Sequence, residues 1–146
     1  MIEAAFAWLR GNIGRLDDDR VIVHGDYDLR NILVAEGHIS AVLDWEMSRL
    51  GHRAEDLGYF RNEAGRGIDW ADFIDAYQEA GAAPINPSAV AYFDVWAWLW
   101  RVVIVVTAYS GYYRGEHGNF LYGSTRFVEY EDHLDKLADA LHRARS

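Results

Sequence analysis

The spacing of the apolar residues changes near Asp56, and this change limits the possible folds more than any other feature of the sequence. Before it, short β-branched runs have the length and composition of strands, at 21–23, 32–34 and 39–43. The Glu36-Gly37 turn joins the last two as a hairpin. After it, apolar residues recur every three or four positions, which predicts helices at about 55–63, 69–80, 88–110 and 120–143. A short amphipathic helix is also predicted over 1–14, so the chain has an α+β pattern.

The composition describes one small globular domain. With 146 residues, the chain is long enough for one core and too short for two ordinary ones, which predicts a single domain over 1–146. It has 23 acidic and 14 basic residues and a net charge of -9, the wrong sign for coating nucleic acid or an anionic membrane. The lack of cysteine excludes disulfides, zinc–thiolate sites and a cysteine nucleophile. Glu3 and the brevity of the apolar stretch at 4–9 argue against a secretory signal, and a cytoplasmic location is expected.

The stretch at 89–109 is long and apolar enough to raise the question of a membrane span. Asp94 and Arg101 argue against it, because each charge near the centre of a span costs about 2.5 to 3.5 kcal/mol. We therefore expect a buried helix and no membrane partner. The two charges are seven residues apart and share one helix face, where they either pair or line a cleft. The β-branched run at 102–106 leaves a strand as the alternative.

The polar residues that carry chemistry are concentrated between the first strand and the first long helix. Asp26 and Asn31 bracket a loop between two strands, and Asp44 ends the hairpin that follows. These three side chains can therefore converge at one end of a small sheet. Phosphoryl transfer needs such convergence, because one carboxylate orients the attacking hydroxyl while oxygen ligands hold Mg²⁺ on the phosphates.

Three motifs then give a resemblance to a known family. Residues 24–31 match H-G-D-x-x-x-x-N, and residues 44–46 match D-W-E. Residues 51–58 match G-D-P-x-x-D-L-[AG], except that His52 and Arg53 replace the usual Asp-Pro. The sequence resembles the aminoglycoside phosphotransferase family, small-molecule kinases related to the protein kinases. Within it, the chain is most similar to the branch that includes the kinase-like domain fused to some acyl-CoA dehydrogenases.

The resemblance implies roles for the three converging residues. Asp26 would be the catalytic carboxylate that accepts or orients the substrate hydroxyl. Asn31 and Asp44 would ligate Mg²⁺ and through it hold the phosphates of ATP or another nucleoside triphosphate. The implied activity is transfer of a phosphoryl group to a hydroxyl of a small substrate.

Other residues of the motifs would support this site. Asp56 would be a structural brace of the catalytic loop, and His24 fits a hydrogen-bonded loop brace better than a general base. Glu46 could lie near the metal or the substrate. The departure at His52 and Arg53 puts only the shape of the preceding turn in question.

The resemblance implies the C-terminal lobe of a kinase-like fold: a short N-terminal helix, a small sheet with the catalytic loop, and a mainly helical bundle. The glycine-rich turn and strand lysine of an N-terminal nucleotide-binding lobe have no counterpart, since Lys136 is in the last predicted helix. In one reading the chain is part of a phosphotransferase, inactive by itself, whose missing lobe is supplied in cis or in trans. In the alternative it is a noncatalytic module that binds a ligand or protein, a reading that a homodimer covering that surface would favour.

Overall fold

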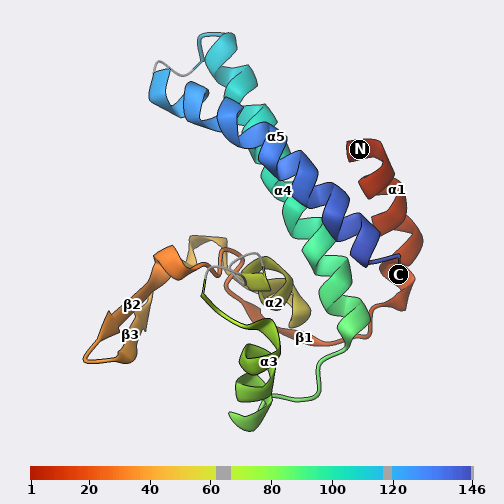
Figure 1. The fold of residues 1–146 in the computed structure, drawn as a ribbon, viewed down its shortest axis with the longest axis vertical. Helices are drawn as coiled ribbons and strands as arrows, with labels where there is room; N and C mark the ends of the chain where they lie inside the picture. Colours follow the sequence, from red (N-terminus) through yellow and green to blue (C-terminus); the bar gives the residue numbers. More distant parts are fainter. Residues whose placement is uncertain (62–66, 117–119, 146) are drawn as a thin grey trace. The chain divides into compact units, whose positions relative to one another are not determined.

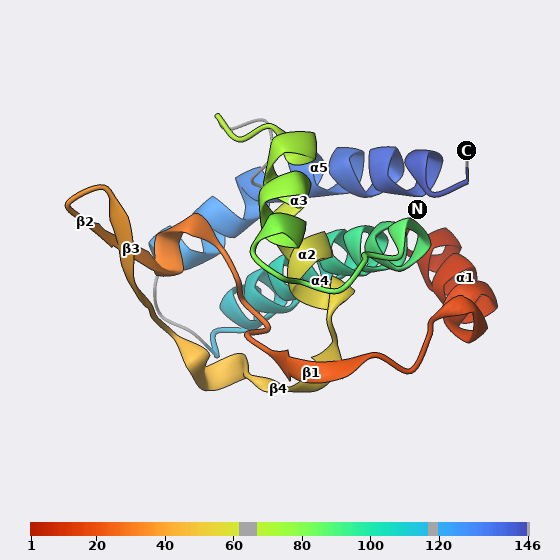
Figure 2. The ribbon, with the colours of Figure 1, turned by 90° about the horizontal axis from the view of Figure 1, so that it is seen from below.

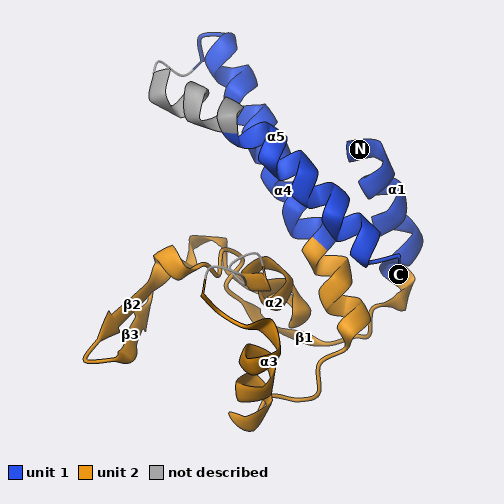
Figure 3. Ribbon diagram, viewed as in Figure 1, with its two compact units in different colours: residues 1–13, 95–146 blue, residues 14–94 orange. Residues whose placement is uncertain are grey.

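The computed structural model describes residues 1–61, 67–116 and 120–145, with the side chains of 120–128 outside the description. These residues form two compact units, one of residues 1–13 and 95–146 (unit 1) and one of residues 14–94 (unit 2), coloured separately in Figure 3. Figure 1 shows the order of the elements along the chain. The single-domain prediction for 1–146 stays a prediction.

Unit 2 contains two antiparallel strand pairs. Strand β1 (Arg20–Val23) pairs with β4 (Arg49–His52), and β2 (Ile32–Ala35) pairs with β3 (His38–Val42). The β2–β3 hairpin confirms the predicted one and projects from the rest of unit 2 in both views (Figures 1 and 2). The sequence did not predict β4, whose short run with a central glycine acquires strand geometry from its pairing with β1.

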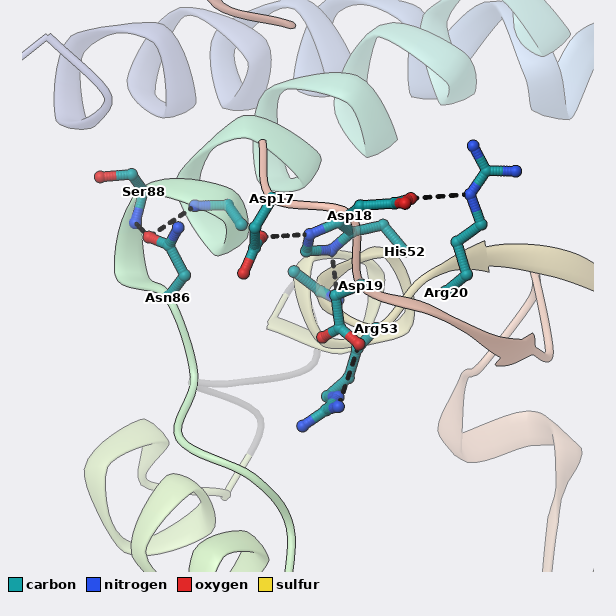
Figure 4. A network of polar contacts seen from close by, with 10 residues as sticks. Asp17, Asp18, Asp19, Arg20, His52, Arg53, Asn86 and Ser88 are labelled. Atoms are coloured by element: carbon teal, nitrogen blue, oxygen red, sulfur yellow. Dashed lines mark hydrogen bonds and ion pairs between the residues drawn. The ribbon is translucent and has the colours of Figure 1, made fainter. Parts of the chain in front are cut away.

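The helices of unit 2 are α2 (Ala54–Phe60), α3 (Trp70–Glu79) and the first two turns of α4 (Pro87–Tyr113). Helix α2 lies unusually close to α4: a Cβ built on Gly58 would be 2.6 Å from the Phe93 carbonyl carbon and 2.7 Å from the Asp94 nitrogen. Only glycine allows this backbone approach. At the start of α4, Asn86 Oδ1 accepts the N–H of Ser88 at 3.0 Å, and Pro87 takes the first helical position (Figure 4).

Unit 1 is helical. It contains α1 (Ile2–Asn12), the greater part of α4, and α5 (Phe120–Arg143), with α4 and α5 side by side in Figures 1 and 2. The Trp98 ring of α4 lies 5.5 Å from the His133 ring of α5. The core is apolar, with these side chains fully or almost fully buried: Ala5, Leu9, Val95, Val102, Val105, Leu137 and Ala140.

The long apolar segment is the helix α4, which confirms a helix and not a strand over 102–106. Among the described residues, α4 is long and apolar enough to cross a membrane by length and composition, and 61% of its most apolar window is buried. Burial of this kind is found in the core helices of globular proteins, as the sequence predicted. Asp94 is buried and the Arg101 guanidinium lies 5.1 Å from the Trp98 ring centroid, while the pairing of the two charges stays a prediction.

Candidate active site

The loop that follows β1 is shaped by Gly25. Its φ is +83°, a left-handed conformation that glycine adopts without strain. A Cβ at this position would also lie 2.6 Å from the Met47 carbonyl oxygen. Glycine is therefore required between His24 and Asp26 for two reasons. One is the left-handed backbone conformation, and the other is the close approach of the segment that leads into β4.

The loop is held by a carboxylate from α2. Asp56 is in the first turn of this helix, and its two oxygens accept the backbone N–H groups of His24 at 2.7 Å and Gly25 at 2.9 Å. A carboxylate that accepts two neighbouring N–H groups fixes the path of the backbone between them. These are the contacts expected of the structural brace that the resemblance implied for Asp56.

His24 connects the loop to the end of β3. Its ring is buried, Nδ1 accepts the N–H of Asp26 at 3.2 Å, and Nε2 donates to the Leu43 carbonyl at 2.7 Å. The imidazole tautomer with its proton on Nε2 satisfies both contacts, and the other tautomer satisfies neither. The ring also packs against Trp45 at 4.7 Å between centroids. Both ring nitrogens thus take part in hydrogen bonds within the chain, and the role of His24 as a loop brace stays a prediction.

The Asp26 carboxylate is oriented by two donors. The Tyr59 hydroxyl donates to Oδ1 at 2.6 Å, and Asn31 Nδ2 donates to Oδ2 at 3.2 Å and to the Asp26 carbonyl at 2.9 Å. The structure therefore brings Asp26 and Asn31 together. Sequence reasoning missed Tyr59, although a signal existed: Tyr59 is three residues after Asp56 and shares its helix face.

Asp44 follows the end of β3, and a backbone hydrogen bond joins its segment to Asn31. The Leu43 N–H donates to the Asn31 carbonyl at 2.8 Å, which ties the two segments together. Asp44 has φ 65° and ψ 55°, a left-handed conformation that is uncommon for a residue with a side chain and is concentrated at functional sites. Its side chain is exposed, as is that of Glu46 in the following 3₁₀ turn, Trp45–Met47.

The residues present fit a magnesium ion. Asn31 uses its Nδ2 on Asp26, so the carbonyl Oδ1 is the atom left for a metal, and Asp44 offers an exposed carboxylate. Across the described ranges, no three His, Cys, Asp or Glu side chains form a cluster that could hold a metal. An amide and one carboxylate are a small protein donor set, which suits Mg²⁺ because this ion keeps waters and binds substrate phosphates.

Two acidic residues near the site form ion pairs with arginines. Asp28 is buried and forms an ion pair with Arg30, and this hydrogen bond is the main reason that the pKa of Arg30 is raised. Glu55 is buried and pairs with Arg49. Burial raises the pKa of Glu55, and the neighbouring Arg49 charge opposes this effect.

The departure from the family motif at His52 and Arg53 is also matched by opposite charges. His52 Nε2 contacts Asp17 Oδ1 at 2.8 Å, and Arg53 Nη2 donates to Asp19 at 3.0 Å (Figure 4). The hydrogen bond from His52 lowers the pKa of Asp17. The His52 Nδ1 accepts the N–H of Ala54, the first residue of α2, at 3.1 Å. The acidic run before β1 thus fixes the turn that the sequence left in question.

Both strand pairs expose apolar side chains opposite each other. Ile22 and Leu50 form a cross-strand pair on β1 and β4 and are 71% and 74% exposed. Val34 and Ile39 form the corresponding pair on the β2–β3 hairpin, with 66% and 62% exposed. Paired exposed aliphatic side chains of this kind are typical of surfaces that another polypeptide covers.

Comparisons with known proteins found similar sequences. A model of the phosphotransferase enzyme family matches residues 1–101. Over 54 residues the chain is 43% identical to acyl-CoA dehydrogenase family member 11 of Gallus gallus, and over 55 residues it is 42% identical to the Homo sapiens protein. Each match covers 36% of this chain and 7% of the relative, so the chain spans a small part of the curated relatives it matches.

A solved structure shows the same fold. A protein from Ralstonia eutropha JMP134, described as a candidate aminoglycoside phosphotransferase, superimposes with a TM-score of 0.77 at 20% identity. The match covers 97% of this chain and 49% of that chain. The predicted α+β architecture of a kinase-like lobe is therefore confirmed.

Proposed function

Because the chain belongs to the phosphotransferase enzyme family, we propose that it is the catalytic half of an ATP- and Mg²⁺-dependent kinase acting on a small hydroxylated molecule. One observation carries this proposal: Asp26 and Asn31 are in contact at 3.2 Å on a loop that Asp56 holds by two backbone N–H groups. A fixed carboxylate beside a fixed amide is what catalysis by positioning requires.

Asp26 would act on the acceptor. Its carboxylate accepts the proton of the substrate hydroxyl while the hydroxyl oxygen bonds to the γ-phosphorus of ATP. The bond from that phosphorus to the bridging oxygen breaks, and ADP leaves with the electron pair. Tyr59 and Asn31 keep the carboxylate in one orientation throughout, so that reorganisation during the reaction is small.

Asn31 Oδ1 and the Asp44 carboxylate would hold the magnesium ion. When bound, the ion neutralises charge on the phosphates and orients them for in-line transfer. The left-handed backbone at Asp44 supports this role, because strain of about 1 kcal/mol or more is kept where the fold fixes a functional residue. Glu46 follows in the same turn and could contact the metal through water or the substrate.

The acidic surface near the site is smaller than the sequence alone indicates. Asp28 and Glu55 are paired with arginines, and Asp56 is occupied by backbone N–H groups. Asp26, Asp44 and Glu46 remain for metal and substrate. This does not favour a cationic substrate once Mg²⁺ is bound, so the proposed substrate class is a small alcohol without a stated charge.

A second polypeptide segment would complete the nucleotide site. The chain covers 49% of the phosphotransferase structure that it resembles. The exposed pairs Ile22–Leu50 and Val34–Ile39 support a covering lobe, in cis or in trans. The alternative, a noncatalytic binding module, remains a separate reading that the following experiment distinguishes.

The test is calorimetric titration of the 146-residue chain with ATP in the presence and absence of Mg²⁺. The variant is Asp44→Asn, since asparagine tolerates the left-handed backbone and removes only the charge. Asp75→Asn on the exposed face of α3 is the matched control. We expect Mg²⁺-dependent binding that Asp44→Asn weakens at least about tenfold, in line with loss of a metal-ligating carboxylate, and that Asp75→Asn leaves unchanged.

Equal binding by the Asp44→Asn and Asp75→Asn proteins would contradict the metal assignment. If the folded wild-type chain does not bind ATP, the titration is repeated with a family N-terminal lobe added in trans. Failure to bind in that mixture would favour the noncatalytic module.

A further inference from the structure

Arg30 is a cation on the same loop as the residues proposed for catalysis. It lies four positions after Asp26 and directly before Asn31. Its guanidinium makes a two-point contact with Asp28, with Nε donating to Oδ1 at 3.0 Å and Nη2 to Oδ2 at 2.8 Å. The Arg30 backbone N–H also donates to Oδ1 at 2.9 Å. This arrangement fixes both the position and the plane of the guanidinium.

The ion pair between Asp28 and Arg30 differs from an ordinary surface ion pair. The Asp28 side chain is 5% exposed, whereas that of Arg30 is 77% exposed. Asp18 and Arg20 form a pair with the same spacing, but both side chains are exposed and a single contact of 2.9 Å joins them. A buried carboxylate that holds an exposed arginine presents a positive charge to solvent in a defined place.

The guanidinium of Arg30 has a further nitrogen that can donate to a ligand. Nη1 takes part in neither contact with Asp28. Arg30 directly precedes Asn31, whose Nδ2 donates to Asp26 Oδ2 at 3.2 Å. The cation is therefore on the same short loop as the carboxylate that the proposed reaction uses.

We propose that Arg30 binds an anionic oxygen of the phosphoryl group that is transferred, with Asp28 as its positioning residue. This rests on the proposed function. Phosphoryl transfer spreads negative charge over the oxygens of the moving group, and a planar guanidinium is well suited to bind them. In the chain, Arg30 lies between Asp26, which is proposed to bind the hydroxyl, and Asn31, which is proposed to bind the metal.

The experiment separates this contact from the metal site by leaving Mg²⁺ out. The ¹⁵N-labelled chain is titrated with inorganic phosphate and with tripolyphosphate, and the side-chain Nε–Hε signals of the arginines are followed by NMR. Arg30→Gln is the test variant and Arg20→Gln the matched control, because each removes an arginine from an Asp-x-Arg pair. Asp28→Asn tests whether the Asp28 carboxylate positions Arg30. Circular dichroism checks that the variants are folded.

We expect the Arg30 signal to shift with both probes and Arg30→Gln to weaken binding about tenfold, the effect of losing one charge-assisted hydrogen bond. Arg20→Gln should bind phosphate as the wild type does. The affinity of Asp28→Asn should lie between that of the wild type and that of Arg30→Gln. Acetate, titrated as a carboxylate probe, should shift the signal less than phosphate.

Phosphate binding by Arg30→Gln with wild-type affinity would overturn the proposal, and so would equal responses to acetate and phosphate. Failure of the proposed function has a different signature. In that case Mg²⁺-dependent ATP binding is insensitive to Asp44→Asn, whatever the phosphate titration of Arg30 shows.

Discussion

The Asp26 carboxylate accepts one hydrogen bond at each oxygen, from Tyr59 and from Asn31. Tyr59 is buried, so its hydroxyl donates in a medium of lower polarity than water, where such a bond is stronger. Asn31 comes from the loop itself, whereas Tyr59 comes from α2, which also carries Asp56. One helix thus positions both the backbone of the loop and the carboxylate that we propose for catalysis.

The contact between Tyr59 and Asp26 can be measured as a coupling free energy. We expect a double-mutant cycle with Tyr59→Phe and Asp26→Ala, followed by urea denaturation, to give a coupling of about 1 to 2 kcal/mol. Tyr27→Phe is the control, because Tyr27 belongs to the same loop and is half-buried, and its ring contacts His24 and Phe60. Additive effects for Tyr59 and Asp26, or the same coupling with Tyr27, would show that the hydrogen bond does not fix the carboxylate.

At the scale of residues, the sequence predicted the site residues that belong to a motif. It missed the residues that reach the site only through tertiary packing. His24, Asp26, Asn31 and Asp56 were found because their spacing is that of a known loop, and the structure shows their contacts. Tyr59 is outside the motif and reaches Asp26 only through the docking of α2. Asp28 and Arg30 were visible as two residues of the sequence, but the burial of Asp28, which lets it hold the exposed Arg30, was not.

At the scale of elements, the docking of α2 on the start of α4 depends on one glycine. Gly58 brings the two backbones together at Phe93 and Asp94, and an added methyl group would have to displace main-chain atoms. We expect Gly58→Ala to lower the free energy of unfolding by about 1 to 3 kcal/mol, although alanine favours a helix more than glycine does. Gly11→Ala in α1 is the control, because nothing lies within 4 Å of its added Cβ. A Gly58→Ala protein as stable as Gly11→Ala would contradict the close approach.

We expect the stability of the fold to depend on pH through Glu55, which lies in α2 directly after β4. Burial raises the pKa of this carboxyl group, so the folded chain binds its proton more tightly than the unfolded chain. Glu55 therefore contributes stability that is complete below its unfolded pKa, near the ordinary 4.5, and is lost as the pH rises through the raised folded value. The Arg49 ion pair opposes the shift without reversing it.

We expect the stability of the wild type relative to Glu55→Gln to increase as the pH falls from 7 to 4. The measurement is urea denaturation of both proteins at each pH, with the exposed Glu79→Gln in α3 as the control for removing one carboxylate. A difference that is constant, or that grows as the pH rises, would mean that the ion pair with Arg49 outweighs burial.

The sequence predicted the elements whose structure is set by a local sequence pattern. It did not predict the element whose structure is set by pairing with a distant segment. The long periodic segments gave α4 and α5 to within a few residues. The Glu36-Gly37 turn gave the β2–β3 hairpin. By contrast, β1 and β4 pair across 25 intervening residues, from 24 to 48, and β4 has no alternation or β-branched run that would predict a strand.

At the scale of the molecule, the exposed apolar pairs on both strand pairs of unit 2 need a covering surface. Monomeric proteins expose single aliphatic side chains freely, but each of these two ribbons exposes two aliphatic side chains directly opposite each other, which favours a surface that binds a partner. The partner we propose is the complementary lobe, because the matching phosphotransferase is about twice as long as the part that this chain covers.

The isolated chain should therefore bind the apolar-surface dye ANS at neutral pH while keeping native circular dichroism. We expect Leu50→Lys together with Ile39→Lys to reduce the ANS fluorescence by about half or more without lowering stability, since both side chains point to solvent. Tyr113→Lys, at an exposed position of α4, is the control for a single apolar residue and should leave the signal nearly unchanged. Sedimentation of the same proteins identifies the occupant: a wild-type dimer that the double variant dissociates would assign this surface to a second copy of the chain and overturn the covering lobe, whereas a monomer that binds the dye supports it.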